Sequence, residues 1–178
     1  MVHRLVDNLE RDYKDSGGNE KREHIANQAV FILAAFLAAL RGEEVFKLNL
    51  GETRKFFLEA TRNVKHPHVV LPLRGRFKGE KGESYHFVAV TFKSNSGLQI
   101  GVWIERALSL KERRGVRHGL FFTDPKGGRM SSRDLEPWIL ERIIEVQRLH
   151  PELIRSEVDV CESYGISKSF RRGSNSEA

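Results

Sequence analysis

The sequence predicts an α+β fold, a mostly helical single domain with a small antiparallel β-hairpin sheet. Most of the chain carries apolar residues at three- and four-residue steps, the spacing of amphipathic helices. β-branched and aromatic residues concentrate in two short runs near the middle, separated by a segment rich in Gly and Lys. The chain has 178 residues, a usual size for one domain. Helices on both sides of a hairpin place the fold in the α+β class.

The N-terminal part is predicted to be helical, with residues 1–19 as a peripheral segment and one domain over residues 20–178. A first short helix should end at the Asp15-Ser16-Gly17-Gly18 cluster. The next helical pattern covers residues 20–40 and includes the longest apolar run, AVFILAAFLAAL at residues 29–40. That run is too short to cross a bilayer, so it predicts a buried central helix. Gly42 follows as a natural break.

The middle of the chain changes character. A further helix is expected within residues 52–64. Residues 68–73 and 85–92 read as two antiparallel strands, joined by a long basic turn over residues 74–84. A helical pattern then runs over residues 100–110.

The C-terminal third is predicted to return to helix after a short buried strand at Leu120-Phe121-Phe122. Ser131 or Ser132 is a good N-cap for a long helix. Its expected inward-facing residues are Leu135, Trp138, Ile139, Ile143, Ile144 and Val146. Another helix is expected over residues 152–160, and the segment 167–178 looks like the start of one more.

Composition and charge narrow the function classes. The formal net charge is +6 and the isoelectric point about 9.6, a balance that suits a polyanionic partner. The single cysteine, Cys161, cannot form a disulfide within the chain, which favours a reducing compartment. The N-terminus lacks the basic-then-apolar order of a signal peptide. An intracellular protein without a membrane segment is therefore expected, in the nucleus if eukaryotic and otherwise in the cytoplasm.

Motifs for metal, nucleotide or serine-hydrolase chemistry are missing from the sequence. His66-Pro67-His68 is the only close histidine pair, and neither HExxH nor CxxC occurs. The glycine-rich stretches lack the GKS or GKT ending of a P-loop, and there is no GxSxG elbow. The expected cofactor and metal requirement is none.

Arginine follows directly on the apolar run at Arg41, with Glu43 and Glu44 beside it. A guanidinium at the end of a buried helix is costly unless it is paired or faces an anion. The simpler interpretation is a helix C-terminus at which Arg41 caps carbonyls and pairs with a carboxylate. The alternative is an anion site.

Two further basic clusters lie in the hairpin turn and near the C-terminus. The turn carries Arg74, Arg76, Lys78 and Lys81, and the C-terminal cluster is KSFRRGS at residues 168–174. In the latter, Phe170 is expected to face the core while its neighbours face outward. Each cluster can serve solubility alone. Together, the three can gather cations around a phosphate, as phosphoryl chemistry without a metal requires.

The order of these clusters resembles that of the tyrosine recombinase (phage integrase-like) family. The sequence of the last cluster is closest to divergent integrase-like domains of eukaryotic mobile elements. Residues 39–48, ALRGEEVFKL, are similar to the family's first box. The resemblance implies an integrase-like catalytic fold for DNA recombination and integration. It makes Arg41 the first catalytic arginine and Glu44 its supporting carboxylate.

The same resemblance assigns the remaining site residues. The family's catalytic lysine lies on a turn between two strands, which points first to Lys78 and second to Lys81. Residues 168–171 fall at the family's His-x-x-Arg box, so Arg171 is the second catalytic arginine and Lys168 stands at the usual histidine position. Lys168 would be a poor general base while protonated. Backbone phosphates of double-stranded DNA are expected to meet the flanking cations Arg74, Arg76, Lys81 and Arg172.

The family's nucleophile has no counterpart in this sequence. It is a tyrosine well beyond the second arginine, whereas Tyr13, Tyr85 and Tyr164 all precede Arg171. The expectation is a C-terminally incomplete catalytic domain that is inactive alone, with the tyrosine on a missing segment, supplied by another recombinase protomer, or lost. Two alternatives remain: a catalytically inert DNA-binding remnant of an integrase, and an unrelated basic scaffold domain.

Overall fold

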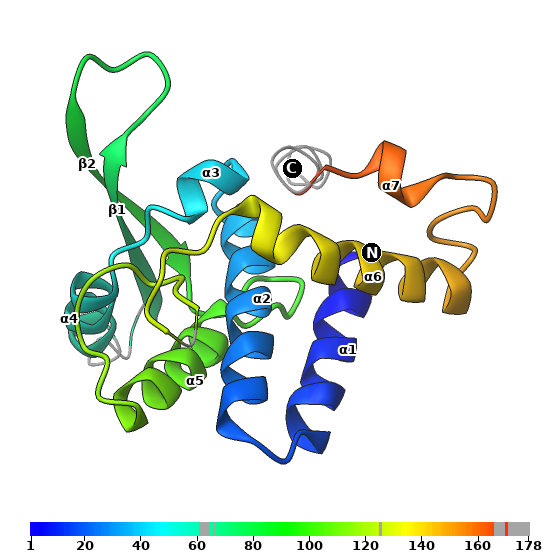
Figure 1. Cartoon of the computed structure of the whole chain (residues 1–178), viewed down its shortest axis with the longest axis horizontal. Coiled ribbons are helices and arrows are strands. Elements are labelled where there is room, and N and C mark those ends of the chain that lie inside the picture. The colour runs from blue at the N-terminus through cyan, green and yellow to red at the C-terminus, as the bar shows by residue number, and fades with distance from the viewer. Residues whose placement is uncertain (61–64, 66, 125, 166–169, 171–178) are drawn as a thin grey trace.

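A computed structural model of the chain describes residues 1–60, 65, 67–124, 126–165 and 170, and it confirms the α+β class (Figure 1). Helices account for most of the described elements, and two antiparallel strands form a small sheet. In chain order the elements are α1 (Val2–Asp15), α2 (Asn19–Leu37), α3 (Gly42–Val45), α4 (Leu50–Ala60), β1 (His68–Arg76), β2 (Glu83–Thr91), α5 (Ile100–Arg113), α6 (Ser132–Leu149) and α7 (Val160–Ser163).

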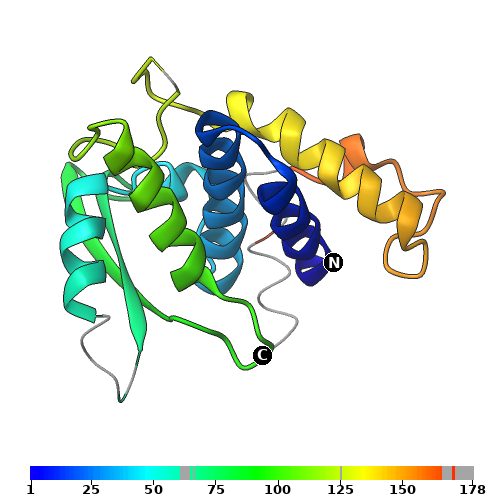
Figure 2. The same ribbon diagram turned by 90° about the horizontal axis from the view of Figure 1, so that it is seen from below.

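Helix α2 lies at the centre of the fold because it is apolar on nearly every side. Every residue from Ile25 to Phe36 is buried. Helices α5 and α1 pack against it, and Figures 1 and 2 both show it surrounded by other elements. Leu5 and Leu9 of α1 are fully buried in the same core. Helix α1 thus contributes Val2, Leu5 and Leu9 to the core, whereas residues 17–19 of the segment expected to be peripheral are exposed.

The end of α2 differs from the expectation and decides the setting of Arg41. The helix ends at Leu37, and Ala39 adopts a left-handed conformation with φ of 50°. A left-handed residue cannot continue a right-handed helix, so the chain turns before the apolar run is complete. Arg41 consequently precedes a new short helix, α3, as its N-cap residue. The expected capping of carbonyls at a helix C-terminus is therefore wrong.

Strands β1 and β2 are the predicted hairpin, extended further into the turn than the sequence suggested. Their register runs from His68 opposite Thr91 to Arg76 opposite Glu83. The connecting turn is therefore only residues 77–82. Inward positions of β1 alternate as expected for a half-buried strand, with Val69, Leu71 and Leu73 buried.

Single-residue bridges join the segment after α3 to the sheet. Leu48 pairs with Leu73 of β1, and Asn49 pairs with Leu120. Leu120 and the buried Phe121 and Phe122 belong to the predicted short strand, which takes part in these isolated bridges only. The segment 48–50 thus lies between the hairpin and the chain near residue 120, and it fixes α3 beside β1.

Helix α6 begins after the N-cap Ser131, as predicted, and uses a narrower inward face than expected. Leu135, Ile139, Ile143 and Val146 are buried, following helical spacing. The side chains of Trp138 and Ile144 lie off this stripe, at 49% and 45% exposure, so their inward placement was wrong.

The chain beyond α6 is less helical than predicted. Residues 151–158 form turns and bends instead of the expected helix over 152–160, and the short helix α7 begins at Val160. Phe170 is buried at 2% exposure, as its predicted inward position required. Apart from Phe170, the segment 167–178 lies outside the described residues.

Candidate functional site

Arg41 is positioned by a capping interaction that occupies Glu44. The backbone N–H of Arg41 donates a hydrogen bond to Oε2 of Glu44 at 2.7 Å, and the backbone N–H of Glu44 donates to the Arg41 carbonyl at 2.9 Å. These two bonds close the first turn of α3. The Glu44 carboxylate therefore supports the backbone at Arg41 and is engaged by that backbone.

The guanidinium of Arg41 is half-buried and forms no ion pair with any residue that the structure describes. A cation at a helix N-terminus gains nothing from the helix dipole, which favours anions there. Among the described residues no carboxylate forms an ion pair with the Arg41 side chain. An external anion would provide a partner for it.

The half of β1 next to the hairpin turn is bonded directly to the segment that follows Arg41. The N–H of Arg74 donates to the carbonyl of Lys47 at 3.0 Å, and the N–H of Asn49 donates to the carbonyl of Pro72 at 3.0 Å. The Lys47 ammonium donates to the carbonyl of Arg76 and lies 4.0 Å from the centre of the Phe77 ring. The Arg41 segment and the hairpin therefore form one connected unit.

Gly75 allows this close packing. Its φ is 150°, and a Cβ atom built there would lie 3.3 Å from Cδ of Lys47. A residue with a side chain at this position would be strained by this φ value and would press against the aliphatic part of Lys47. Lys47 was not singled out from the sequence. The only feature of the sequence that could have indicated Lys47 is its place within residues 39–48.

The turn of the hairpin is held by Glu80. Its carboxylate accepts hydrogen bonds from the Ser84 hydroxyl and lies 2.8 Å from Nε2 of His86. The hydrogen bond from Ser84, together with His86 and Lys47, lowers the pKa of Glu80. The His86 ring also packs edge-on against Phe77, with ring centres 4.4 Å apart. These contacts give the turn a defined shape.

The hairpin cations project from this frame without carboxylate partners. Arg74, Arg76, Lys78 and Lys81 are all exposed, and none forms an ion pair within the described part of the chain. The Arg74 guanidinium lies 5.3 Å from the centre of the Tyr85 ring. Such a cluster attracts a polyanion because its charges are not neutralised within the fold.

Of the nine predicted site residues, six are placed by the structure. Arg41 and Glu44 lie at the start of α3, Arg74 and Arg76 lie on β1, and Lys78 and Lys81 lie in the turn. The other three, Lys168, Arg171 and Arg172, lie outside the described residues. Their neighbour Phe170 lines a small cavity with Ile139 and Ile143 of α6. The convergence of Arg171 with Arg41 and Lys78 therefore stays a prediction.

Tyr85 belongs to an exposed aromatic cluster beside the hairpin cations. Its side chain is 42% exposed, and its ring stacks on that of Phe87 with ring centres 5.9 Å apart. The hydroxyl donates to Oε1 of Glu52 at 2.9 Å, and this bond raises the pKa of Tyr85. The ring of Tyr85 thus lies on the outer face of β2.

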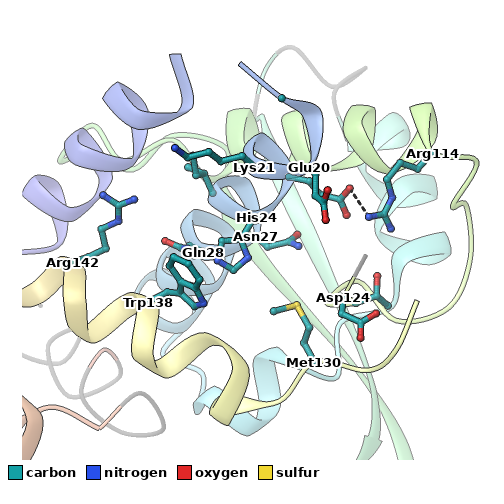
Figure 3. A pocket seen from close by; sticks show the side chains of 14 residues that line it. Glu20, Lys21, His24, Asn27, Gln28, Arg114, Asp124, Met130, Trp138 and Arg142 are labelled. Carbon is teal, nitrogen blue, oxygen red and sulfur yellow. Dashed lines mark ion pairs between the residues drawn. The ribbon is translucent and has the colours of Figure 1, made fainter. Parts of the chain in front are cut away.

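A second candidate site was not predicted from the sequence. A cavity of about 650 Å³ lies between the first half of α2, α6 and the chain between α5 and α6. Figure 3 shows His24, Gln28 and Trp138 gathered on one side of it, with Asp124 and Met130 on another. Its polar residues come from three distant segments, so no local pattern revealed it.

Comparisons with known proteins give no relative: no family model, no curated protein and no solved structure matches this chain. Within the described ranges, no group of three or more His, Cys, Asp or Glu side chains is arranged to hold a metal ion. No helix there is both long and apolar enough to cross a membrane.

Proposed function

We propose that this chain binds double-stranded DNA through its hairpin and the Arg41 segment, as part of a tyrosine-recombinase-type strand-transfer domain with an integrase-like fold. The observation that carries the proposal is the guanidinium of Arg41. It lacks a carboxylate partner among the described residues, while the nearby Glu44 is engaged by the backbone. Four further exposed cations lie on the hairpin bonded to that segment.

The proposed chemistry is a metal-free transfer of one DNA phosphate. Arg41 and Arg171 bind the non-bridging oxygens and stabilise the charge of the transition state. A tyrosine hydroxyl from outside this sequence attacks phosphorus, forms a 3′-phosphotyrosyl bond and breaks the bond to the 5′ oxygen. Lys78 gives its proton to that leaving oxygen. Attack by another strand's hydroxyl reverses these steps and reseals the DNA.

A second candidate function is DNA binding without cleavage, as in an inert remnant of an integrase. The state of Tyr85 favours it. This tyrosine lies on the hairpin beside Arg74, but its hydroxyl is bound to Glu52 and its pKa is raised. A raised pKa makes the nucleophilic phenolate harder to form. Tyr85 is thus unsuited to replace the missing nucleophile.

DNA binding is tested by fluorescence anisotropy with a labelled duplex over a range of salt concentrations. Each phosphate contact contributes about −0.9 to the slope of log affinity against log salt. We expect Arg41→Ala and Lys78→Ala each to reduce the magnitude of this slope by about one. The matched control is Arg148→Ala, in the last turn of α6, which lies on the other side of the molecule from the hairpin (Figure 1). Equal slopes for all three variants would contradict the proposal.

Strand transfer is distinguished from inert binding by restoring a nucleophile. The tyrosine-bearing C-terminal segment of a working recombinase is fused to this chain, and a nicked duplex is offered as substrate. A covalent protein–DNA adduct on a denaturing gel, lost with Arg41→Ala, supports the transferase. Salt-dependent binding without an adduct supports the inert remnant.

A further inference from the structure

The cavity beside α2 lies far from the proposed DNA-binding face. Its lining on α2 comes from residues 18–28, whereas Arg41 follows the opposite end of that helix. At 1.5 Å per residue, His24 and Leu37 are about 20 Å apart along the axis. A volume of about 650 Å³ is in the range of pockets that bind small molecules. The cavity is thus a separate candidate for ligand binding.

Unpaired polar atoms concentrate around this cavity. Asn27 and Gln28 are 2% and 1% exposed, yet Oδ1 of Asn27 and Oε1 of Gln28 have no hydrogen-bond partner within the described structure. Two more lining atoms share this state: Nε2 of His24 and Oγ1 of Thr123. Buried polar groups are almost always hydrogen-bonded. Four such atoms around one cavity indicate that a partner is missing from it.

Three charged residues of the lining, Glu23, Arg114 and Arg142, are already neutralised by neighbours. The Glu23 carboxylate lies 2.9 Å from the Lys111 ammonium and 3.3 Å from Arg114. Arg142 is paired with Asp12 of α1 and, at 3.5 Å, with Glu145. Burial, aided by the charge of Arg142, lowers the pKa of His24 and favours its neutral form. An uncharged ligand therefore suits the interior better than a phosphate or a carboxylate.

The walls also favour a flat aromatic ligand. The Trp138 indole is half-exposed on the cavity rim, and its centre lies 4.9 Å from that of His24 in an edge-to-face arrangement. Ile25 and Met130 add apolar surface. Figure 3 shows Trp138 and Gln28 close to each other, so an aromatic face and an amide are presented together. This combination of ring and amide is suited to a planar heterocycle.

We infer that this cavity binds a purine base that carries an exocyclic amino group, as found in adenosine. A carboxamide presents one donor group and one acceptor, and it pairs with the amino group and ring nitrogen on one edge of adenine. The terminal side-chain torsions that orient the amides of Asn27 and Gln28 are broad and roughly two-fold, so either end of each amide can face the cavity. The base would contact Trp138 and satisfy the buried amides. This inference does not depend on the proposed DNA function.

The test is isothermal titration calorimetry of the full chain with adenosine, and with inosine as the analogue that lacks the amino group. We expect adenosine to bind, and inosine to bind at least about tenfold more weakly, as a well-placed bidentate contact requires. Asn27→Leu and Gln28→Met remove the amides at nearly constant volume. Each should weaken adenosine binding about tenfold or more. Arg148→Ala, outside the lining, is the control and should bind as the unaltered chain does.

Thermal unfolding of the same variants shows whether they are folded. If a variant does not fold, the comparison of adenosine with inosine on the unaltered chain still decides the question. The inference is overturned if adenosine gives no binding heat, if inosine binds equally well, or if folded Asn27→Leu and Gln28→Met variants bind adenosine unchanged.

Discussion

The helical body and the hairpin differ in whether their basic residues pair with carboxylates. In the body, cations are held by carboxylates on other elements: Nη2 of Arg106 lies 3.0 Å from Glu10, and Nη2 of Arg11 lies 3.1 Å from Glu145. Lys111 and Arg114 both pair with Glu23. On the hairpin, Arg74, Arg76, Lys78 and Lys81 have no such partner among the described residues.

This difference shows where the net charge of +6 is available to a partner. Some cations in the body, such as Arg106 and Arg142, link α1 to α5 and α6, so their charge is largely cancelled where it lies. Cations on the hairpin face solvent and keep their field. The net charge counted from the sequence does not distinguish cations that are paired with carboxylates from cations that are not. The two regions therefore make different contributions, one to stability and the other to association, and substitutions can separate these contributions.

The largest expected effect is on the buried pair of Lys111 and Glu23. Their side chains are 0% and 4% exposed, so Lys111→Met leaves a buried carboxylate without its nearer partner. Breaking such a pair costs about 3–5 kcal/mol of unfolding free energy, whereas replacing both members by apolar residues is often neutral or stabilising. The double variant Lys111→Met with Glu23→Leu should therefore recover most of the loss. Urea unfolding followed by circular dichroism measures both.

Arg113→Met is the control for this pair because Arg113 is exposed on the same helix. It should change the unfolding free energy by less than about 0.5 kcal/mol. If Lys111→Met costs no more than Arg113→Met, the buried pair does not stabilise the body as the comparison requires.

A smaller effect is expected from His24, as a dependence of stability on pH. Burial, together with Arg142, holds its pKa below the ordinary 6.5. The unfolded chain then takes up a proton more readily than the folded one, so this contribution is full above that value and is lost as pH falls through the folded-state pKa. Urea unfolding between about pH 8 and pH 5 should show the decline. His24→Leu should flatten it.

The matched control for losing an imidazole is His3→Leu, on the exposed side of α1. An unchanged decline in the His24→Leu variant would assign the pH dependence to other groups. It would also remove the basis for a neutral His24 in the cavity beside α2, on which the choice of an uncharged ligand depends.

The smallest effect on stability is expected on the hairpin. Lys78→Ala combined with Lys81→Ala removes two exposed cations that make no ion pair in the described structure. The unfolding free energy should change by less than about 0.5 kcal/mol, since surface substitutions away from special features rarely exceed that. The same variant should show a weaker salt dependence of DNA binding. A loss of stability above about 1 kcal/mol would mean that these lysines serve the fold.

The sequence located the candidate site better than it described its geometry. Arg41 and the hairpin cations could be found because each lies beside a strong local signal, an apolar run or a glycine-rich turn. The sequence did not reveal that Arg41 begins a new helix and does not end the preceding one. That start depends on the left-handed Ala39, a conformation that no propensity favours for alanine.

The cavity beside α2 illustrates the limit of local patterns. Asn27 and Gln28 interrupt an apolar helix, which by itself is ordinary. Their significance appears only when Thr123 and Trp138, from segments about a hundred residues away, enclose the same space. In the same way Trp138 was assigned to the core from its spacing, and the structure places it on the cavity rim.

By itself the sequence determined the α+β class, the central buried helix, the hairpin and the excess of positive charge. Each follows from periodicity, propensity or composition, which act over a few neighbouring residues. The tertiary structure decided which cations are cancelled, that Glu44 caps the backbone at Arg41, and where buried polar groups surround a cavity. These features depend on which segments far apart in the chain come close together, because burial and ion pairing arise from contacts between such segments.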